Sequence, residues 1–368
     1  MPNRSSPRTL ARFINLKNRL DEEAGVESDR ITLSRKKRKS SKTGSNDRSH
    51  RQEKKKSTPR RLSHTFSIVA RDSATGEMGV AVQSHWFNVG ADVPWAEAGV
   101  GAVATQSFVD PSYGPKGLAL MRQGKSANEA LKELIAADSG QAVRQVAMVD
   151  AKGNVAVHTG KRCVEFAGHV TGQGYSVQAN LMLNDRVPGA MAKAFESANG
   201  RLADRMMAAL EAAQEVGGDI RGKQSAAMLV VNAKSSDKPW ADRKVDLRVE
   251  DHSEPVQELR RLLNVARAYE HMNAGDSALE KTDIEAAVTE YGKAMKLAGN
   301  NAEIAFWSAL TLAMKGRVEQ AKPIFRKVFS ADRNWIEVLK RLPKAGVISD
   351  DDAGHILLRQ ILDDAGES

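Results

Sequence analysis

The amino-acid sequence predicts an α+β domain of sheets covered by helices, followed by a helical repeat module and preceded by a disordered basic arm. Three observations carry this prediction. Strand and helix patterns alternate in blocks after residue 64, a 34-residue period runs through the C-terminal part, and the positive charge is confined to the N-terminal part. A chain of 368 residues is long enough for two globular units.

Residues 1–63 form the predicted basic extension. Residues 1–62 contain 19 Lys+Arg and 7 Asp+Glu, a net charge of +12, which leaves −3 for the rest of the chain. The segment is rich in Ser, Lys, Arg and Asn and has little apolar surface to bury. Because that burial cannot offset the conformational entropy lost on folding, we expect disorder, with at most a short helix over residues 10–23. The arm is either a solvated extension or a segment that binds a polyanion such as nucleic acid. The acidic remainder of the chain makes nucleic acid an expected partner for the arm alone.

Composition excludes several other classes of protein. The single cysteine, Cys163, rules out an internal disulfide and a thiolate zinc site. No run approaches 18 apolar residues, and the start MPNRSSPRTLARF lacks the apolar region of a secretory signal, so we expect a soluble, cytoplasmic protein without a membrane span. P-loop, HExxH and GxSxG motifs are absent, and His158 and His169 have no carboxylate neighbours at ligand spacing. We therefore expect no cofactor and no metal.

The layered domain is predicted over residues 64–256. Alternating or apolar runs bounded by Gly-containing turns indicate strands, and 3.6-residue periodicity indicates helices, of which the second opens with Ser126 and Glu129 as a capping box. The predicted strands cover residues 65–72, 78–87, 99–106, 144–150, 154–158, 225–231 and 244–250. The predicted helices cover residues 115–122, 126–137, 187–197 and 202–215. This order along the chain, with strands first, then helices and then strands again, favours sheets with helices on their outer faces.

Residues 257–345 are predicted to form a tetratricopeptide-like helical module, with residues 346–368 as a tail containing a short helix. Five residue pairs separated by 34 positions match in kind, which is the tetratricopeptide period. They are Ala278 and Leu312, Ile284 and Val318, Ala287 and Ala321, Tyr291 and Phe325, and Ala294 and Val328. Helices over 258–271 and 332–342 would close so short a stack, whose concave groove would bind a protein partner. The alternative is a generic helical bundle.

Polar residues gather where the predicted strands end. Hydroxyls, amides and imidazoles lie there beside glycines that allow close backbone approach. They are Thr65, Ser84, His85, Gln106, Ser107, Asp110, Tyr113, His158, Tyr175, Gln178 and Asn180. Ser84 and His85 are adjacent on a strand and point to opposite faces, so we place Ser84 in the site and His85 elsewhere.

Several segments resemble the domain of unknown function 1028 family over residues 65–263. They are TFSIVARD, GVAVQS, GVGAVATQSFVDPSYGP, VHTG, GYSVQAN and RGKQSAAMLVV. That family looks like a member of the N-terminal nucleophile hydrolase fold, a four-layer αββα sandwich. The resemblance therefore implies amide-bond hydrolysis by a threonine, serine or cysteine at a mature N-terminus, whose own α-amine acts as the base.

Carried onto this sequence, the resemblance makes Thr65 the nucleophile. Asn180 would donate to an oxyanion. The alternatives, of which the first is the commoner role for a buried asparagine, are that Asn180 satisfies backbone groups and that Thr65 is an ordinary residue at the start of a strand. The expected substrate-binding residues are Ser84, Gln106, Ser107, Asp110 and Tyr113, with turn formation as the alternative for Asp110.

Two functions follow from this reading. Because 64 residues precede Thr65, either the chain is cut before Thr65 and acts as an amide hydrolase, or the site is silent. In the second case the protein is a non-catalytic scaffold that binds a protein through its helical repeats. Resembling proteins are sometimes described as peptidoglycan-binding, which fits this alternative. We expect a homo-oligomer in either case.

Overall fold

The computed structural model describes residues 62–236 and 238–366. The contact pattern divides the chain into two compact units, one that extends to Arg267 and one that begins at Ala268. The domain boundaries expected after residues 63, 256 and 345 stay predictions. Residues 1–61 of the expected basic arm, with its short helix, lie outside the described residues, whereas residues 62 and 63, expected to be disordered, form a short strand.

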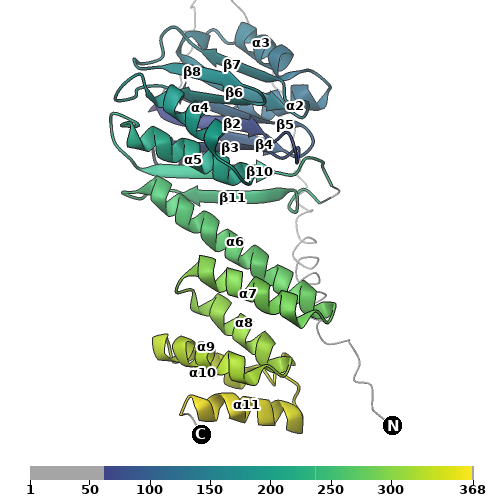
Figure 1. The fold of residues 1–368 in the computed structure, drawn as a ribbon. Coiled ribbons are helices and arrows are strands. Elements are labelled where there is room, and N and C mark those ends of the chain that lie inside the picture. Colours follow the sequence, from purple (N-terminus) through teal and green to yellow (C-terminus); the bar gives the residue numbers. More distant parts are fainter. Residues whose placement is uncertain (1–61, 237, 367–368) are drawn as a thin grey trace, which may run out of the picture. The chain divides into compact units, whose positions relative to one another are not determined.

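The first unit contains a six-stranded antiparallel sheet, called sheet B here, with Thr65 at the start of a central strand (Figure 1). Its strand order is β11-β10-β3-β2-β9-β8. The bounds are β2 (Thr65–Arg71), β3 (Met78–Ser84), β8 (Gly168–Gly172), β9 (Tyr175–Ala179), β10 (Ser225–Val231) and β11 (Arg243–Val249). β2 pairs with β3 on one side and with β9 on the other, so neither edge of β2 is exposed.

The second sheet, sheet A, is five-stranded and also antiparallel. Its order is β1-β5-β6-β7, and β4 pairs with β5 as well. The bounds are β1 (Leu62–Ser63), β4 (Pro94–Glu97), β5 (Gly101–Phe108), β6 (Arg144–Asp150) and β7 (Val155–Thr159). Two short strands therefore share the same edge of β5.

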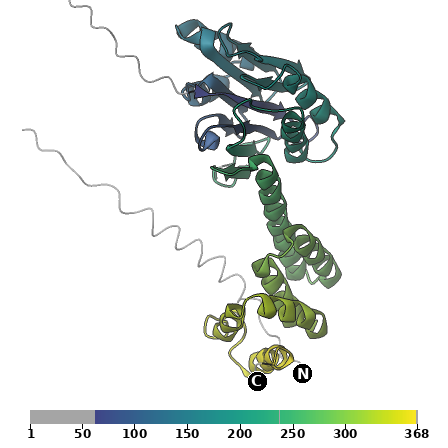
Figure 2. The ribbon, with the colours of Figure 1, turned by 90° about the vertical axis from the view of Figure 1, so that its left-hand side faces the viewer.

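Alternation along the strands sorts side chains into three apolar layers. Ala102 and Val149 of sheet A face Val80 and Val82 of sheet B. The outer face of sheet A packs on α2 (Tyr113–Arg122) and α3 (Ala127–Ala137). The outer face of sheet B packs on α4 (Val187–Ser197) and α5 (Leu202–Glu215), as the turned view shows (Figure 2).

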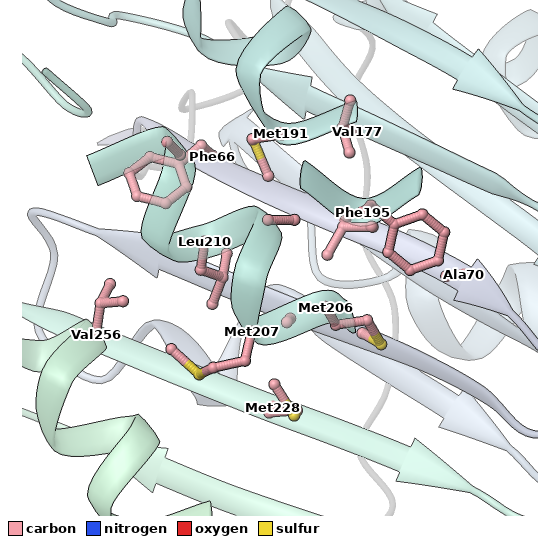
Figure 3. Packing of buried hydrophobic residues seen from close by; sticks show 14 of the residues in the cluster. Phe66, Ala70, Val177, Met191, Phe195, Met206, Met207, Leu210, Met228 and Val256 are labelled. Carbon is pink, nitrogen blue, oxygen red and sulfur yellow. The ribbon is translucent and has the colours of Figure 1, made fainter. Parts of the chain in front are cut away.

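The helical face of sheet B carries the largest cluster of buried apolar residues in this unit. Phe66 of β2 and Met228 of β10 pack with Met206 and Leu210 of α5 (Figure 3). Val256, near the start of α6 (Pro255–Glu280), belongs to the same cluster. This packing fixes the position of β2, and therefore of Thr65 at its first residue.

The second unit is helical. Besides the end of α6 it contains α7 (Ile284–Ala298), α8 (Ala302–Met314), α9 (Val318–Ala331), α10 (Asn334–Arg341) and α11 (Asp352–Asp364). α7 and α9 begin 34 residues apart, and their equivalent residues Ala287 and Ala321, and Tyr291 and Phe325, are buried in one cluster. α11 is the short helix expected in the tail.

The mixed α+β class and the helical C-terminal part were predicted correctly. The capping box at α3 is present, since the Ser126 side chain accepts from Glu129 N and the Glu129 side chain accepts from Ser126 N. Strands β1, β4, β8 and β9 were missed, because each has five residues or fewer. Within the described residues no helix combines the length and the apolar character needed to cross a membrane.

We expect Leu210→Ala to destabilise the first unit by about 2–5 kcal/mol, because it leaves a cavity beneath β2. Urea unfolding followed by circular dichroism measures this change. Leu183→Ala, at a residue that is 51% exposed, is the control and should stay within about 0.5 kcal/mol of the unchanged protein. Equal losses for the two variants would contradict this assignment of the core.

Candidate functional site

The space between the two sheets is apolar at one end and polar at the other. Thr65, Ser67 and Val69 point from β2 toward sheet A, because alternate residues of a strand share a face. Val69 meets alanines and valines, whereas Thr65 and Ser67 meet amide side chains. The polar residues of this region, which are completely buried, are Thr65, Ser67, Ser84, Gln106, Gln145, Ser176, Gln178 and Asn180.

Three amide side chains close a hydrogen-bond network around the carbonyl of Thr65. Gln106 Nε2 donates to Thr65 O (3.1 Å) and to Gln145 Oε1 (2.7 Å). Asn180 Nδ2 donates to the same Gln145 oxygen (2.9 Å) and to Thr65 O (3.4 Å), and Asn180 N also donates to Thr65 O (3.1 Å). Ser67 Oγ donates to Gln106 Oε1 (2.6 Å). Buried amides that are satisfied in this way hold the backbone rigidly at the start of β2.

The hydroxyl of Thr65 lies beside the peptide bond that precedes it. Thr65 Oγ1 donates to Ser84 Oγ (3.2 Å), and Ser84 Oγ donates to the carbonyl oxygen of His64 (2.6 Å). Arg221 Nη2 donates to the same carbonyl oxygen (2.7 Å). The buried carboxylate of Asp219 accepts from Arg221 Nη2 (2.7 Å) and Nε (3.1 Å), which orients the guanidinium. Two donors, one of them cationic, therefore polarise the His64 carbonyl.

The side chain of His64 is buried against the same network. Its Nδ1 lies 2.7 Å from Asn180 Oδ1, and its ring contacts Phe108 edge-on at 5.8 Å between centroids. Because Asn180 Nδ2 donates to two carbonyl oxygens, its Oδ1 faces the imidazole as an acceptor, so Nδ1 carries the proton. Burial lowers the pKa of His64 below its ordinary value of 6.5, and the charge of Arg221 lowers this pKa further.

Two residues with left-handed backbone conformations lie near the C-terminal ends of β5 and β9, the strands that carry Gln106 and lead to Asn180. Ser107, the residue after Gln106, has φ 72°, and Leu181, the residue after Asn180, has φ 58°. Such conformations are uncommon for residues other than glycine, and they concentrate at functional sites. Each follows directly after an amide residue that contacts Thr65 O.

A cavity of about 490 Å³ lies next to the amide network. Gln145 Nε2 donates to Thr159 Oγ1 (2.9 Å) and Gly168 O (3.2 Å), two residues of the cavity wall. Cys163 also lines the cavity, and burial raises the pKa of its thiol. The other lining residues are Gly160, Lys161, Glu165, Phe166, Ala167, Asp185 and Pro188.

The structure brings some of the expected site residues together and separates others. Ser84, Gln106 and Asn180 contact Thr65. Asp110 and Tyr113 belong to a second cluster, in which Tyr113 Oη donates to Asp138 (3.0 Å) and Arg144 pairs with Asp138 (2.8 Å) and lies 3.9 Å from Asp110. Burial and the Asp138 carboxylate raise the pKa of Tyr113.

The remaining expected residues have simpler surroundings. Ser107 is buried and pairs through its backbone with Ser63 of β1 and Arg144 of β6. His85 contributes its backbone N–H to Asp219 (3.2 Å). His158 Nε2 lies 2.8 Å from Gln141 O.

Sequence reasoning missed Arg221, Asp219, Gln145 and His64. Arg221 lies in the segment RGKQSAAMLVV, which carried the family resemblance, so its charge beside a site strand was an available signal. Gln145 begins an apolar strand and gave no signal of its own. Among the described residues, no group of three or more His, Cys, Asp or Glu side chains could hold a metal ion.

Comparison with known proteins assigns the family. Residues 65–259 match a family of unknown function (DUF1028), and the chain belongs to that family. A crystal structure of a protein from Silicibacter pomeroyi, described as a member of the same family, is 32% identical to this chain. That match covers 54% of this chain and 84% of the other, with a TM-score of 0.50. No curated protein matches this chain at a significant level.

We expect the free energy of unfolding of the first unit to fall as the pH falls from about 7 to 5. Burial lowers the pKa values of His64 and His169 in the folded state below the ordinary histidine value of 6.5. When the pH falls below 6.5, the unfolded chain therefore binds more protons than the folded chain does. The stabilisation is complete above pH 6.5 and is lost below it. Urea titrations at several pH values measure the slope, which should be smaller in a His64→Gln, His169→Gln variant. A slope that is unchanged there, or reduced equally by His252→Gln at an exposed site, would contradict this assignment.

Proposed function

We propose that this protein is an amide hydrolase whose nucleophile is Thr65, exposed as an N-terminal residue when the chain cleaves its own His64–Thr65 bond. The observation that carries the proposal is the His64 carbonyl, which receives hydrogen bonds from Ser84 and Arg221 while the Thr65 hydroxyl lies within 3.2 Å of Ser84 Oγ. The order of layers, helices, sheet, sheet and helices, also fits the four-layer N-terminal nucleophile hydrolase sandwich.

Self-cleavage in this proposal begins with attack of Thr65 Oγ1 on the carbonyl carbon of His64. The Thr65 hydroxyl proton moves to Ser84, which passes its own proton to the carbonyl oxygen and leaves a neutral five-membered adduct. Arg221 stabilises the negative charge that develops on this oxygen. The C–N bond then breaks as the adduct's hydroxyl proton reaches the Thr65 nitrogen, and an ester remains on Thr65. Water hydrolyses the ester, leaving the carboxylate of His64 and the free amine of Thr65.

Turnover of a substrate would again form an ester on Thr65 Oγ1, which water would again hydrolyse. An α-amine has an ordinary pKa of about 8, so the freed amine of Thr65 can take the proton of its own hydroxyl near neutral pH. Ser84 and Arg221 are the donors best placed for an oxyanion. Asn180 is committed to Thr65 O and Gln145, and we assign it to positioning the nucleophile and to contact with the acyl group.

We also propose that the helical unit is tetratricopeptide-like and binds a protein partner. The supporting observation is the 34-residue offset between the first residues of α7 and α9, with buried small residues three positions into each helix. This role is compatible with hydrolysis. It would remain as the scaffold function if Thr65 were inactive.

Self-cleavage is tested with recombinant full-length protein followed by intact mass over time. We expect Thr65→Ala to stay uncut and Thr65→Ser to be cut, because serine retains a hydroxyl. Arg221→Lys should slow cleavage by about 10²–10³-fold, which is typical for loss of an oxyanion donor. Arg243→Lys, at an exposed residue of β11, is the matched control and should cleave at the rate of the unchanged protein.

Circular dichroism shows whether each variant is folded. Cleavage of folded Thr65→Ala at the same bond would contradict the proposal. An unchanged protein that stays intact would contradict it as well and would favour the scaffold.

A further inference from the structure

The residues just before Thr65 occupy a strand position beside β5. β4 covers this edge of β5 from Gly101 to Ala104, and β1 continues it by pairing with Ser107 and Phe108. The pairing of β1 comprises two residues, Leu62 with Phe108 and Ser63 with Ser107. So short a strand is held weakly by its own hydrogen bonds, and a cut at His64 would leave this edge of β5 available to another extended chain.

The side chain of His64 fills a site of defined chemistry at the end of this strand. Asn180 Oδ1 accepts from the imidazole at 2.7 Å, and the Phe108 ring lies perpendicular to the imidazole, with 5.8 Å between the ring centroids. Asn180 cannot easily offer a donor there instead, because its Nδ2 is held by Gln145 Oε1 and Thr65 O. The site therefore favours a neutral side chain with an N–H that points at Asn180, and it leaves an unpaired acceptor against an apolar side chain.

Self-cleavage and substrate turnover share one chemical species. The ester formed on Thr65 Oγ1 during self-cleavage carries an acyl group that ends in Leu62, Ser63 and His64. A peptide substrate with the same acyl sequence would form the identical ester, with its leaving amine taking the proton. The places that hold residues 62–64 are therefore the places that hold the acyl side of a substrate.

We propose that the mature protein acts on peptides bound in extended form along β5, with histidine as the preferred residue on the acyl side of the cleaved bond. This proposal rests on the proposed function of Thr65. It adds the substrate class and assigns Asn180 as the residue that determines specificity.

The test uses full-length protein that has cleaved itself, as shown by intact mass, with the released basic segment removed by cation exchange. The probes are fluorogenic amides of acetyl-Leu-Ser-His, acetyl-Leu-Ser-Leu, acetyl-Leu-Ser-Glu and acetyl-His. We expect kcat/KM for acetyl-Leu-Ser-His to exceed that of each other probe by at least about tenfold. A difference of this size is what the loss of one hydrogen bond, or of one short strand pairing, should cause.

A specificity variant separates contact from general structural damage. In Asn180→Leu the ratio of kcat/KM between the histidine and leucine probes should fall by about tenfold or more, whatever happens to the absolute rates. Asn184→Leu, in the segment before α4, should leave this ratio unchanged. If Asn180 had only a structural role, Asn180→Leu would lower kcat/KM for the histidine and leucine probes by the same factor.

The outcomes distinguish this inference from the function on which it rests. A chain that cleaves itself and hydrolyses the probes without preference for histidine, or without benefit from Leu-Ser, overturns the inference and leaves the proposed function standing. A cleaved chain that turns over none of the four probes overturns it too. An uncut chain overturns both.

Discussion

Burial of two consecutive carbonyl groups, those of His64 and Thr65, is the constraint on which the rest of the site depends. Both lie between two sheets, where an unsatisfied carbonyl would cost about 1–3 kcal/mol. The protein satisfies them with side chains from different elements: Gln106 and Asn180 for Thr65, and Ser84 and Arg221 for His64. The sheets must keep their mutual register for these bonds to form.

This arrangement explains why one end of the sandwich is polar. Valines and alanines pack between the sheets at one end, and the amides at the other end add hydrogen bonds that are satisfied only in one geometry. The arrangement also balances charge, since Arg221 is paired with the buried carboxylate of Asp219. A cation next to the His64–Thr65 peptide bond is then available without an uncompensated buried charge. The same groups that stabilise the uncut chain are those that would polarise its peptide bond.

Much of the fold could be predicted from the sequence because it depends on local pattern. The β2–β3 hairpin and helix α3 have strong periodicity and clear turn or capping residues. The site was less accessible. Thr65, Ser84 and Asn180 were singled out as polar residues at strand ends, but Gln145 and Arg221 come from segments distant in sequence, and the fold alone brings them to Thr65. Asp110 and Tyr113 looked equivalent to Gln106 in sequence. β5 continues to Phe108, and the turn over Asp110–Tyr113 that follows it carries both residues to a different cluster.

The central claim is that the His64–Thr65 bond is a reactive bond rather than an ordinary link between an arm and a domain. N-terminal sequencing of the protein purified from its own cells, combined with intact mass, tests this claim most directly. We expect a mature chain that begins Thr-Phe-Ser-Ile. A chain that is recovered with His64 still joined to Thr65 would contradict it, and the polar cluster would then be a structural device of the sandwich.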